Sequence, residues 1–432
     1  MKKTLGKIAA AIVPLLLLSL AMTYFIIEMD EEEKGYFSNE KKEWTFMVYL
    51  DADNNLEGAG IEDLNEMEEA GSTEEVNIVV LIDRAEGYDT SNGDWTDWRC
   101  YYVLKDPAGA NNEIVSQELN YPYLKKGEEP NMGDPETLIN FVSWSMLKFP
   151  AEHYLLSLWN HGGAIKGVCW DDSTDPVDNL NLPELRDAFS QIVNKTGKRL
   201  DIVGFDACLM GGISTHYQLN PFCDIVVASE ASESNDGWPY ELICGDLISM
   251  PKMEPEELAR LIVEHYVASY GTLEPWVTQA AFKTEEMERV FEDLDVVAEI
   301  LKKNLPLYQA SIADSRENAE SYDLTKEGPY MPEMSGYPMC DLWNFLDELE
   351  RPEHGTAFDD ELMNAVTTLK NSISLARIAY GSGTDKPDSH GLSIYFPQTN
   401  NTGTSTYSDV YDTLEFAKDH KWDDFLKAYY LD

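Results

Sequence analysis

Short apolar runs alternate with amphipathic stretches over the first half of the chain, from Trp44 onward. Several of these runs are almost continuous in Val, Ile, Leu and Tyr, which is typical of strands covered on both faces. The strand-like runs are 44–52, 76–84, 98–105, 153–161, 200–207 and 224–231. The helix-like stretches between them are 57–70, 135–149, 183–194 and 209–219. Repeated strand–helix–strand units predict an α/β fold with a mostly parallel sheet and helices on both faces.

The pattern becomes richer in helices after about residue 250. Helices are predicted over 254–270, 284–303, 338–350, 358–372 and 410–430, and strands over 277–283, 374–381 and 391–397. A Pro/Gly-rich stretch at 325–338 is predicted to be a loop. We therefore divide the chain into an N-terminal segment (1–43), a core (44–250) and a helix-rich C-terminal part (251–432) that completes the sheet and packs on the core.

The N-terminal segment contains an apolar run, residues 8–27, which follows three lysines and precedes acidic residues within 28–33. The run is long enough to cross about 30 Å of hydrocarbon, and no small-residue cleavage site follows it. These features favour an uncleaved membrane anchor over a removed signal peptide, which would leave the protein secreted. By the positive-inside rule, the rest of the chain is expected outside the cytoplasm.

The charge balance argues against one class of partner. The chain has 32 Lys and Arg residues against 79 Asp and Glu, a formal net charge of −47. Such a surface repels nucleic acid and favours solubility, cations and basic partners. We expect no nucleic-acid-binding role. Adaptation to a salty or acidic medium explains the bulk charge as well as any role toward a substrate.

The cysteines are widely spaced and contain no C-x-x-C pair. They are Cys100, Cys169, Cys208, Cys223, Cys244 and Cys340. They are too sparse for a disulfide framework and wrongly spaced for a structural zinc, so no metal ligands are assigned. One or two disulfides stay open as alternatives in an oxidising compartment.

Two strand-like runs end in residue types suited to nucleophilic catalysis. His161 ends one run and Cys208 follows another, with one helix candidate between them. Two strands joined by one such crossover can be neighbours, so both side chains can meet at the carboxyl edge of the sheet. A thiol is only a few per cent ionised near neutral pH, and a nearby histidine or helix N-terminus promotes the thiolate. The pattern predicts Cys208 as a nucleophile and His161 as its acid–base partner.

The glycines beside His161 fit the same chemistry. Gly162 and Gly163 remove side chains, so a backbone N–H can point at a substrate carbonyl. Together with the Cys208 N–H, this amide would form an oxyanion hole, whose donors lie about 2.7–3.1 Å from the developing charge.

In combination these residues resemble the clostripain family of cysteine endopeptidases, relatives of the caspases, gingipains and legumains. The resemblance covers most of residues 44–400 and rests on "WTFMVYLDADNNLE", "LSLWNHGG", "IVGFDACLM" and "GLSIYFP". It implies a caspase-like three-layer α/β/α sandwich. It also implies cleavage of protein or peptide substrates after Arg or Lys, through a Cys/His dyad and a thioester intermediate.

Carried over by position, the resemblance makes Cys208 the nucleophile, His161 the general acid–base, and the Gly162 and Cys208 amides the oxyanion hole. Asp206 matches the acid at the floor of the S1 pocket, and Asp236 is a second candidate for that pocket. Because side chains alternate along a strand, Asp206 is expected to face the same side as Cys208, where a basic side chain would pair with it.

Two stretches qualify what the resemblance implies. Members of the family often process themselves between the His and Cys blocks, but the acidic loop 171–179 has no basic residue, so self-cleavage is not expected there. Some relatives depend on calcium, and residues 51–55 and 171–175 offer oxygen ligands without EF-hand spacing. No cofactor is required by the chemistry, and calcium stays an open alternative. N-capping of the following helix is the simpler explanation of 51–55.

Two alternatives are carried forward. Cys169 lies close to His161 in the sequence, but packing beside Trp170 is expected to make it structural. The whole chain could instead be a catalytically silent caspase-like surface protein that binds a partner. The presence of both Cys208 and His161 argues against that alternative, since a silent protein has no chemical reason to keep both.

Overall fold

The computed structural model describes residues 40–109, 111, 113–322, 338–351, 358–397 and 408–431. Residues Lys42–Asp432 form one compact unit. The apolar run 8–27 and nearly all of the loop predicted at 325–338 lie outside the described residues. No helix in the described ranges combines the length and the hydropathy needed to cross a bilayer.

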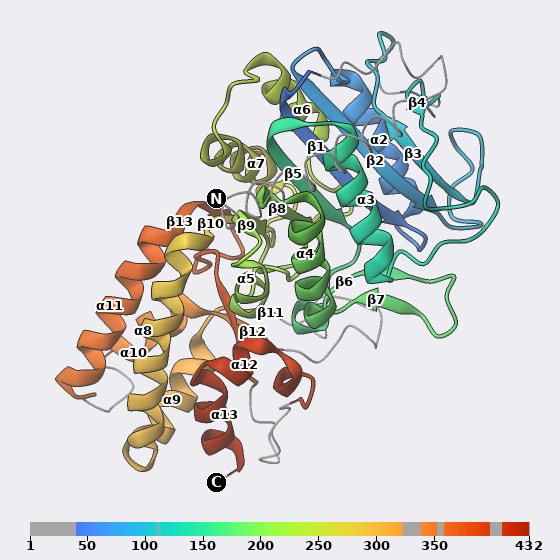
Figure 1. Cartoon of the computed structure of the whole chain (residues 1–432). Helices are drawn as coiled ribbons and strands as arrows, with labels where there is room; N and C mark the ends of the chain where they lie inside the picture. The colour runs from blue at the N-terminus through green and yellow to red at the C-terminus, as the bar shows by residue number, and fades with distance from the viewer. Residues whose placement is uncertain are drawn as a thin grey trace, which may run out of the picture. The chain divides into compact units, whose positions relative to one another are not determined.

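A nine-stranded sheet lies at the centre of this unit (Figure 1). In spatial order its strands are β13 (Arg377–Ser382), β10 (Thr278–Lys283), β9 (Cys223–Ala228), β8 (Leu200–Asp206), β5 (Ala151–Trp159), β1 (Lys42–Ala52), β2 (Val76–Arg84), β3 (Trp98–Tyr102) and β4 (Gln117–Glu118). The five strands from β9 to β2 run parallel, and the two strands at each edge run antiparallel to their neighbours. The predicted mostly parallel sheet is confirmed.

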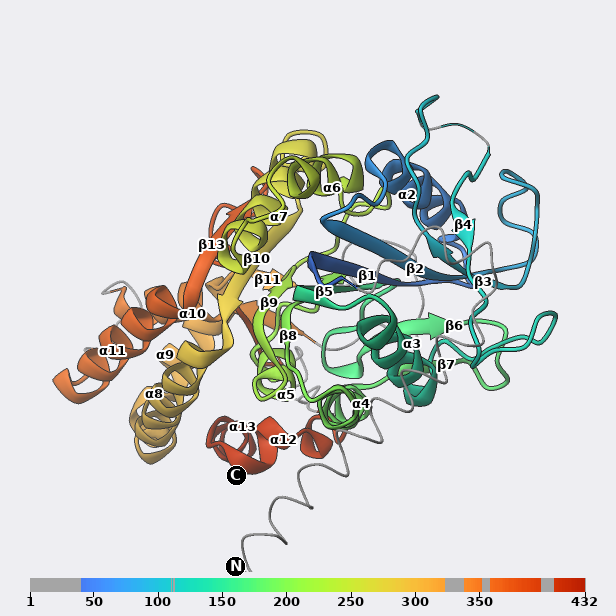
Figure 2. The same ribbon diagram turned by 45° about the horizontal axis from the view of Figure 1, so that its top comes forward.

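The central strands are buried along most of their length because helices cover both of their faces. Every residue of β2 is buried, as are the last nine residues of β1. Figure 2 shows one layer of helices on each side of the sheet. On one side lie α2 (Glu57–Ala70), α6 (Tyr240–Ser249) and α7 (Pro255–Tyr270); on the other lie α3 (Pro135–Lys148), α4 (Leu182–Thr196) and α5 (Ile213–Leu219). This is the expected three-layer α/β/α sandwich.

Local sequence signals set the ends of several helices. Asp134 caps α3 through the Glu136 amide, with Pro135 in the first turn. Asn181 and Glu184 form a capping box at the start of α4, and Gly197 ends that helix in the left-handed conformation. A side-chain oxygen at the N-cap accepts from amides that have no partner inside the helix, and a left-handed C-cap costs glycine little.

The residues after 250 add helices and extend the sheet. Strands β10 and β13 come from this part of the chain and form one edge of the central sheet. The remaining helices are α8 (Thr284–Lys303), α9 (Leu305–Asn318), α10 (Leu342–Glu350), α11 (Asp360–Ala376), α12 (Glu415–Asp419) and α13 (Trp422–Leu431). The remaining strands are β6 (Val168–Asp171) and β7 (Asp178–Leu180), which form a hairpin, and β11 (Ser321–Tyr322), β12 (Met339–Asp341) and β14 (Ser393–Tyr395), which form a small sheet.

Candidate functional site

The two predicted catalytic residues directly follow the ends of adjacent parallel strands, at matching positions of the pairing. In the pairing of β5 with β8, Trp159 lies opposite Asp206. The Asn160 amide also donates to the Asp206 carbonyl oxygen (3.2 Å). His161 and Cys208 each follow this pair by two residues, so both lie at the carboxyl edge of the sheet. The prediction that their strands are neighbours is confirmed.

A small cavity of about 40 Å³ lies where these strands end. This volume accommodates only a few water molecules, since one water needs roughly 10–15 Å³ of such space. The residues that line it are Leu56, Trp159, Asn160, His161, Asp206, Ala207, Cys208, Glu233, Ser234, Asn235 and Gly237. Three of the predicted site residues, His161, Asp206 and Cys208, therefore line one cavity.

Cys208 is partly exposed and lies at a turn that hydrogen bonds to the segment after β9. Its sulfur accepts a hydrogen bond from the Glu233 amide (3.2 Å). Leu209 has a positive φ of 65°, an uncommon conformation for a non-glycine residue. The Leu209 amide donates to the Ala231 carbonyl oxygen (2.9 Å), which ties this turn to the segment that follows β9.

His161 is partly buried, and its Nε2 lies 2.8 Å from Asn55 Oδ1. Burial lowers the pKa of His161 to about 4. The imidazole is therefore neutral near pH 7, the state in which it can accept a proton from a thiol.

Gly162 is the point of closest approach between the two predicted catalytic segments. A Cβ at this position would overlap the carbonyl oxygen of Cys208. Gly162 pairs with Val168 in an isolated bridge, but the hydrogen bond beside it runs from the Gly163 amide to the Gly167 oxygen (2.9 Å). That hydrogen bond does not use the Gly162 amide, which stays a predicted oxyanion donor.

Asp206 is buried and lines the cavity. Its Oδ2 accepts hydrogen bonds from the Trp238 amide (3.0 Å) and the Tyr240 hydroxyl (2.9 Å), and its carboxyl group shares a hydrogen bond with that of Glu233. Burial raises the pKa of both carboxyl groups, and the hydrogen bond between them raises the pKa of Glu233 further while it lowers that of Asp206. Both carboxyl groups therefore hold their protons to higher pH than exposed carboxyl groups do.

A third carboxyl group, Asp63 of α2, lies beside this pair. Its Oδ2 accepts a hydrogen bond from Trp159 Nε1 (2.5 Å), and burial, followed by repulsion from Asp206, raises its pKa. A Cβ placed on Gly237 would lie 2.6 Å from Asp63 Oδ2 and 3.1 Å from Asp206 Oδ2, so the two acids face the same glycine. Asp236, the predicted second pocket acid, is exposed and does not line the cavity.

The sequence pattern did not point to three of the residues at this site: Asn55, Asp63 and Glu233. Asp63 carried a detectable signal, because it lies on the buried face of an amphipathic helix, three positions from Gly60 and four from Met67. An acidic side chain on the apolar face of a helix is buried, so it needs a hydrogen-bond or charge partner. Asn55 and Glu233 lie in loops, where the sequence pattern has no comparable periodicity.

The five other cysteines are buried, as is typical of structural cysteines. Cys169 is fully buried, and burial raises the pKa of its thiol, so it is a poor nucleophile. Cys100, Cys223, Cys244 and Cys340 are also buried. All six cysteines lie within the described residues, and no disulfide joins any two of them.

The acidic stretch at 51–55 does not cap the following helix, contrary to expectation. The N-cap of α2 is Leu56, and no side chain makes a capping hydrogen bond there. The stretch instead contacts the loop after β6, where Asp53 Oδ2 accepts from the Ser173 amide (3.1 Å). Across the ranges that the structure covers, no three His, Cys, Asp or Glu side chains form a group that could hold a metal ion.

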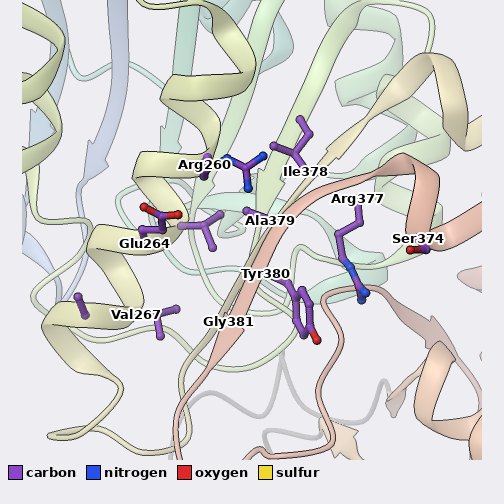
Figure 3. Close-up of a pocket in the computed structure, with 11 residues that line it drawn as sticks. Arg260, Glu264, Val267, Ser374, Arg377, Ile378, Ala379, Tyr380 and Gly381 are labelled. Atoms are coloured by element: carbon purple, nitrogen blue, oxygen red, sulfur yellow. The ribbon is translucent and has the colours of Figure 1, made fainter. Parts of the chain in front are cut away.

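A separate groove lies at the outer edge of the sheet, between α7 and β13 (Figure 3). Arg260 and Glu264 of α7 and Arg377 and Tyr380 of β13 are among the residues that line it. It shares no lining residue with the cavity at Cys208.

Comparisons with known proteins agree with this architecture. A family model described as the Clostripain family matches residues 48–429. Clostripain from Hathewaya histolytica is 25% identical over 424 residues, which cover 86% of this chain and 77% of that protein. Two solved structures share the fold: an inactive zymogen C11 protease from Parabacteroides distasonis, and a secreted C11 cysteine protease from Bacteroides thetaiotaomicron in complex with an irreversible peptide inhibitor. They are 18% and 19% identical to this chain, each with a TM-score of 0.59 and coverage of 89% of this chain and 99% of its own. This chain belongs to the clostripain family and is a C11 cysteine peptidase.

Proposed function

We propose that the protein is an extracytoplasmic endopeptidase that cleaves peptide bonds after Arg or Lys, with Cys208 as nucleophile and His161 as general acid–base. One observation carries the proposal. Trp159 and Asp206 are paired on adjacent strands, His161 and Cys208 each follow that pair by two residues, and both line one cavity with the buried Asp206.

Each step of the hydrolysis has a candidate group at the site. His161 accepts the thiol proton, and the Cys208 sulfur attacks the scissile carbonyl carbon. The amides of Gly162 and Cys208 stabilise the oxyanion of the tetrahedral intermediate. Protonated His161 then gives its proton to the leaving amine, and a thioester remains on Cys208. Water, deprotonated by His161, hydrolyses this thioester and releases the acid product.

The buried acids support a preference for a basic P1 side chain. Asp206 and Glu233 line a cavity that accommodates only a few water molecules, and Asp63 lies beside them. A guanidinium or ammonium group bound there would favour the ionised carboxyl groups and pair with them through charge-assisted hydrogen bonds. Because the cavity accommodates only a few water molecules, we expect the lining segment 233–237 or Leu56 to move outward when an arginine side chain binds.

The location of the enzyme rests on its first residues. We propose that residues 8–27 anchor the chain in a membrane and that Lys2, Lys3 and Lys7 keep the N-terminus in the cytoplasm, so that the peptidase lies outside. Release as a secreted protein is the alternative. We propose that no metal is required, so cleavage is expected to persist in the presence of EDTA.

The decisive experiment uses residues 42–432, the compact unit, on short peptides that differ only at P1, with Arg, Lys, Asp or Ala. Cleavage after Arg and Lys is expected, and Cys208→Ala is expected to abolish it. Undiminished cleavage by Cys208→Ala would remove Cys208 as the nucleophile. Preference for Asp or Ala at P1 would remove the role proposed for Asp206.

A second arm tests the alternative of a silent binding protein. An electrophilic Arg-based probe is expected to label Cys208 under reducing conditions, as located by peptide mass spectrometry. Absence of labelling both with and without calcium would favour the binding protein.

A further inference from the structure

We infer that Asn55 is a positioning residue for His161: its side-chain oxygen fixes which ring nitrogen carries the proton and which one faces the thiol. This inference rests on the proposed function and adds a third member to the proposed Cys/His pair.

The contact that carries the inference joins His161 Nε2 to Asn55 Oδ1 at 2.8 Å. The amide oxygen of asparagine can only accept a hydrogen bond, so Nε2 carries the proton. In a neutral imidazole the other nitrogen, Nδ1, is then bare and able to accept the proton of a thiol. Without such a partner the ring could exchange tautomers and rotate about its side-chain bonds, and part of the population would present the wrong nitrogen.

A buried set of hydrogen bonds holds the two residues at this separation. Asn54 and Asn160, which precede Asn55 and His161 in the chain, both donate to the carbonyl oxygen of Trp170 (3.1 Å each). Asn160 also donates to the Asp51 carbonyl oxygen (2.7 Å), and its own side-chain oxygen accepts from the Trp170 amide (3.1 Å). Asn54 and Asn160 are both buried. Two neighbouring residues anchored to one carbonyl group leave Asn55 and His161 little freedom to separate.

The ordinary structural roles do not account for the side chain of Asn55. Leu56 is the N-cap of α2 and has no side-chain cap, so Asn55 does not cap the helix. The turn before α2 is held by Asn54, whose side-chain oxygen accepts from the Leu56 amide (2.9 Å). Asn55 itself is exposed, so its loss removes no buried packing.

The test compares Asn55→Ala and Asn55→Asp with the wild type, and uses Asn371→Ala, an exposed asparagine in α11, as the matched control. The measurements are kcat and KM for an Arg peptide between pH 5 and 9, and the rate at which iodoacetamide alkylates Cys208. The other titratable groups that line the cavity are Cys208, Asp206 and Glu233, and none of these variants changes them.

Asn55→Ala is expected to lower kcat by about 10- to 100-fold with little change in KM, the loss typical of removing the partner that orients a functional histidine. Asn55→Asp keeps an acceptor oxygen and is expected to retain more activity than alanine. Its carboxylate also stabilises the imidazolium, so the pH limb set by His161 is expected to move up by about one unit or more. Asn371→Ala is expected to match the wild type.

Wild-type kcat and an unmoved pH profile in both Asn55 variants would overturn the inference. That result is distinguishable from failure of the proposed function, in which the wild type itself would show no Cys208-dependent cleavage and no preferential alkylation at Cys208.

Discussion

At the scale of single residues, Gly162 makes the contact that determines how closely the two proposed catalytic segments approach. Any side chain there would overlap the Cys208 carbonyl oxygen. Gly162→Ala is therefore expected to push the His161 loop away from Cys208. The expected loss in kcat/KM is about 100-fold, because a displacement near 1 Å costs that much in rate. Initial rates on an Arg peptide measure it.

Gly245→Ala is the matched control for that substitution. Gly245 lies inside α6 with no atom near its Cβ position, so full activity and equal or slightly greater stability are expected. If Gly162→Ala kept wild-type kinetics while folded, the close contact would have no catalytic importance.

The buried acids allow their contributions to P1 preference to be separated. Asp206→Asn is expected to lower kcat/KM for Arg peptides by about 10- to 100-fold, since a hydrogen bond to a charged group contributes about 1.5–3 kcal/mol. Asp63→Asn is expected to lower the same kcat/KM by a smaller factor. Asp63 faces the same glycine as Asp206, but its Oδ2 already accepts a hydrogen bond from Trp159. Asp236→Asn is expected to change the value less than about threefold, because exposed charges are screened by solvent.

The measurement for these three variants is the ratio of Arg to Ala cleavage, which cancels general damage to the catalytic groups. If Asp236→Asn lowered the ratio of Arg to Ala cleavage more than Asp63→Asn did, Asp236 rather than Asp63 would be the second pocket acid.

The residues that the sequence predicted at this site come from two short blocks, each directly after a strand. Strand register alone brings His161, Asp206 and Cys208 to one edge of the sheet, so their proximity was predictable. Asn55 lies 106 positions before His161, and Asp63 lies 96 positions before its partner Trp159. These contacts depend on how α2 packs against the sheet, which no local pattern encodes.

At the scale of elements, the packing of α2 on β1 depends on Gly60. A Cβ at Gly60 would lie 2.6 Å from Leu50 Cδ2 and 3.0 Å from Ala52 Cβ. Gly60→Ala is therefore expected to lower the free energy of unfolding by about 1–3 kcal/mol, the usual cost of overpacking a core. Chemical denaturation measures it.

Gly58→Ala in the same helix provides the control. The nearest atom to a Cβ at Gly58 is 3.8 Å away, an ordinary contact, so this variant is expected to be neutral or to stabilise by up to about 1 kcal/mol. Equal stability of the two variants would contradict the close packing of α2 on β1.

Helices and strands with strong periodicity or clear caps have the bounds predicted for them. For other elements, long-range contacts shift or interrupt the predicted bounds. The helix predicted from 209 begins at 213, because the Leu209 and Gly211 amides donate to carbonyl oxygens in the segment after β9. The helix predicted over 410–430 is interrupted, with α12 ending at Asp419 and α13 beginning at Trp422. The first residues of the helix predicted from 338 form β12, which pairs with β14.

At the scale of the whole molecule, buried acids determine how stability depends on pH. Burial raises the pKa of a set of carboxyl groups well above the usual range, so the folded chain keeps protons that the unfolded chain releases near pH 4. The set is Asp51, Asp63, Asp83, Glu230 and Glu233. For the same primary reason the pKa of Asp171 and Glu129 rises to about 7 and that of Glu66 to about 9. The stabilisation that these carboxyl groups contribute is fully present below about pH 4. It is lost as the pH rises through their raised pKa values in the folded state.

Buried histidines oppose this trend only on the acidic side. Burial lowers the pKa of His216 to about 3, so the unfolded chain gains a proton below about pH 6.5 that the folded chain does not take. We therefore expect a higher Tm near pH 5.5 than at pH 8, measured at one ionic strength because the net charge of −47 responds to salt. An equal or higher Tm at pH 8 would contradict this expectation.

The hairpin of β6 and β7 lies between His161 and Cys208 along the chain, yet the two residues are brought together by the pairing of β5 with β8. A protease that cuts the turn at 172–177 would therefore divide the polypeptide without separating the site. The nicked protein is expected to run as two bands under denaturing conditions and as one particle under native conditions. The two proposed catalytic residues would then belong to two covalently separate chains of a single folded body.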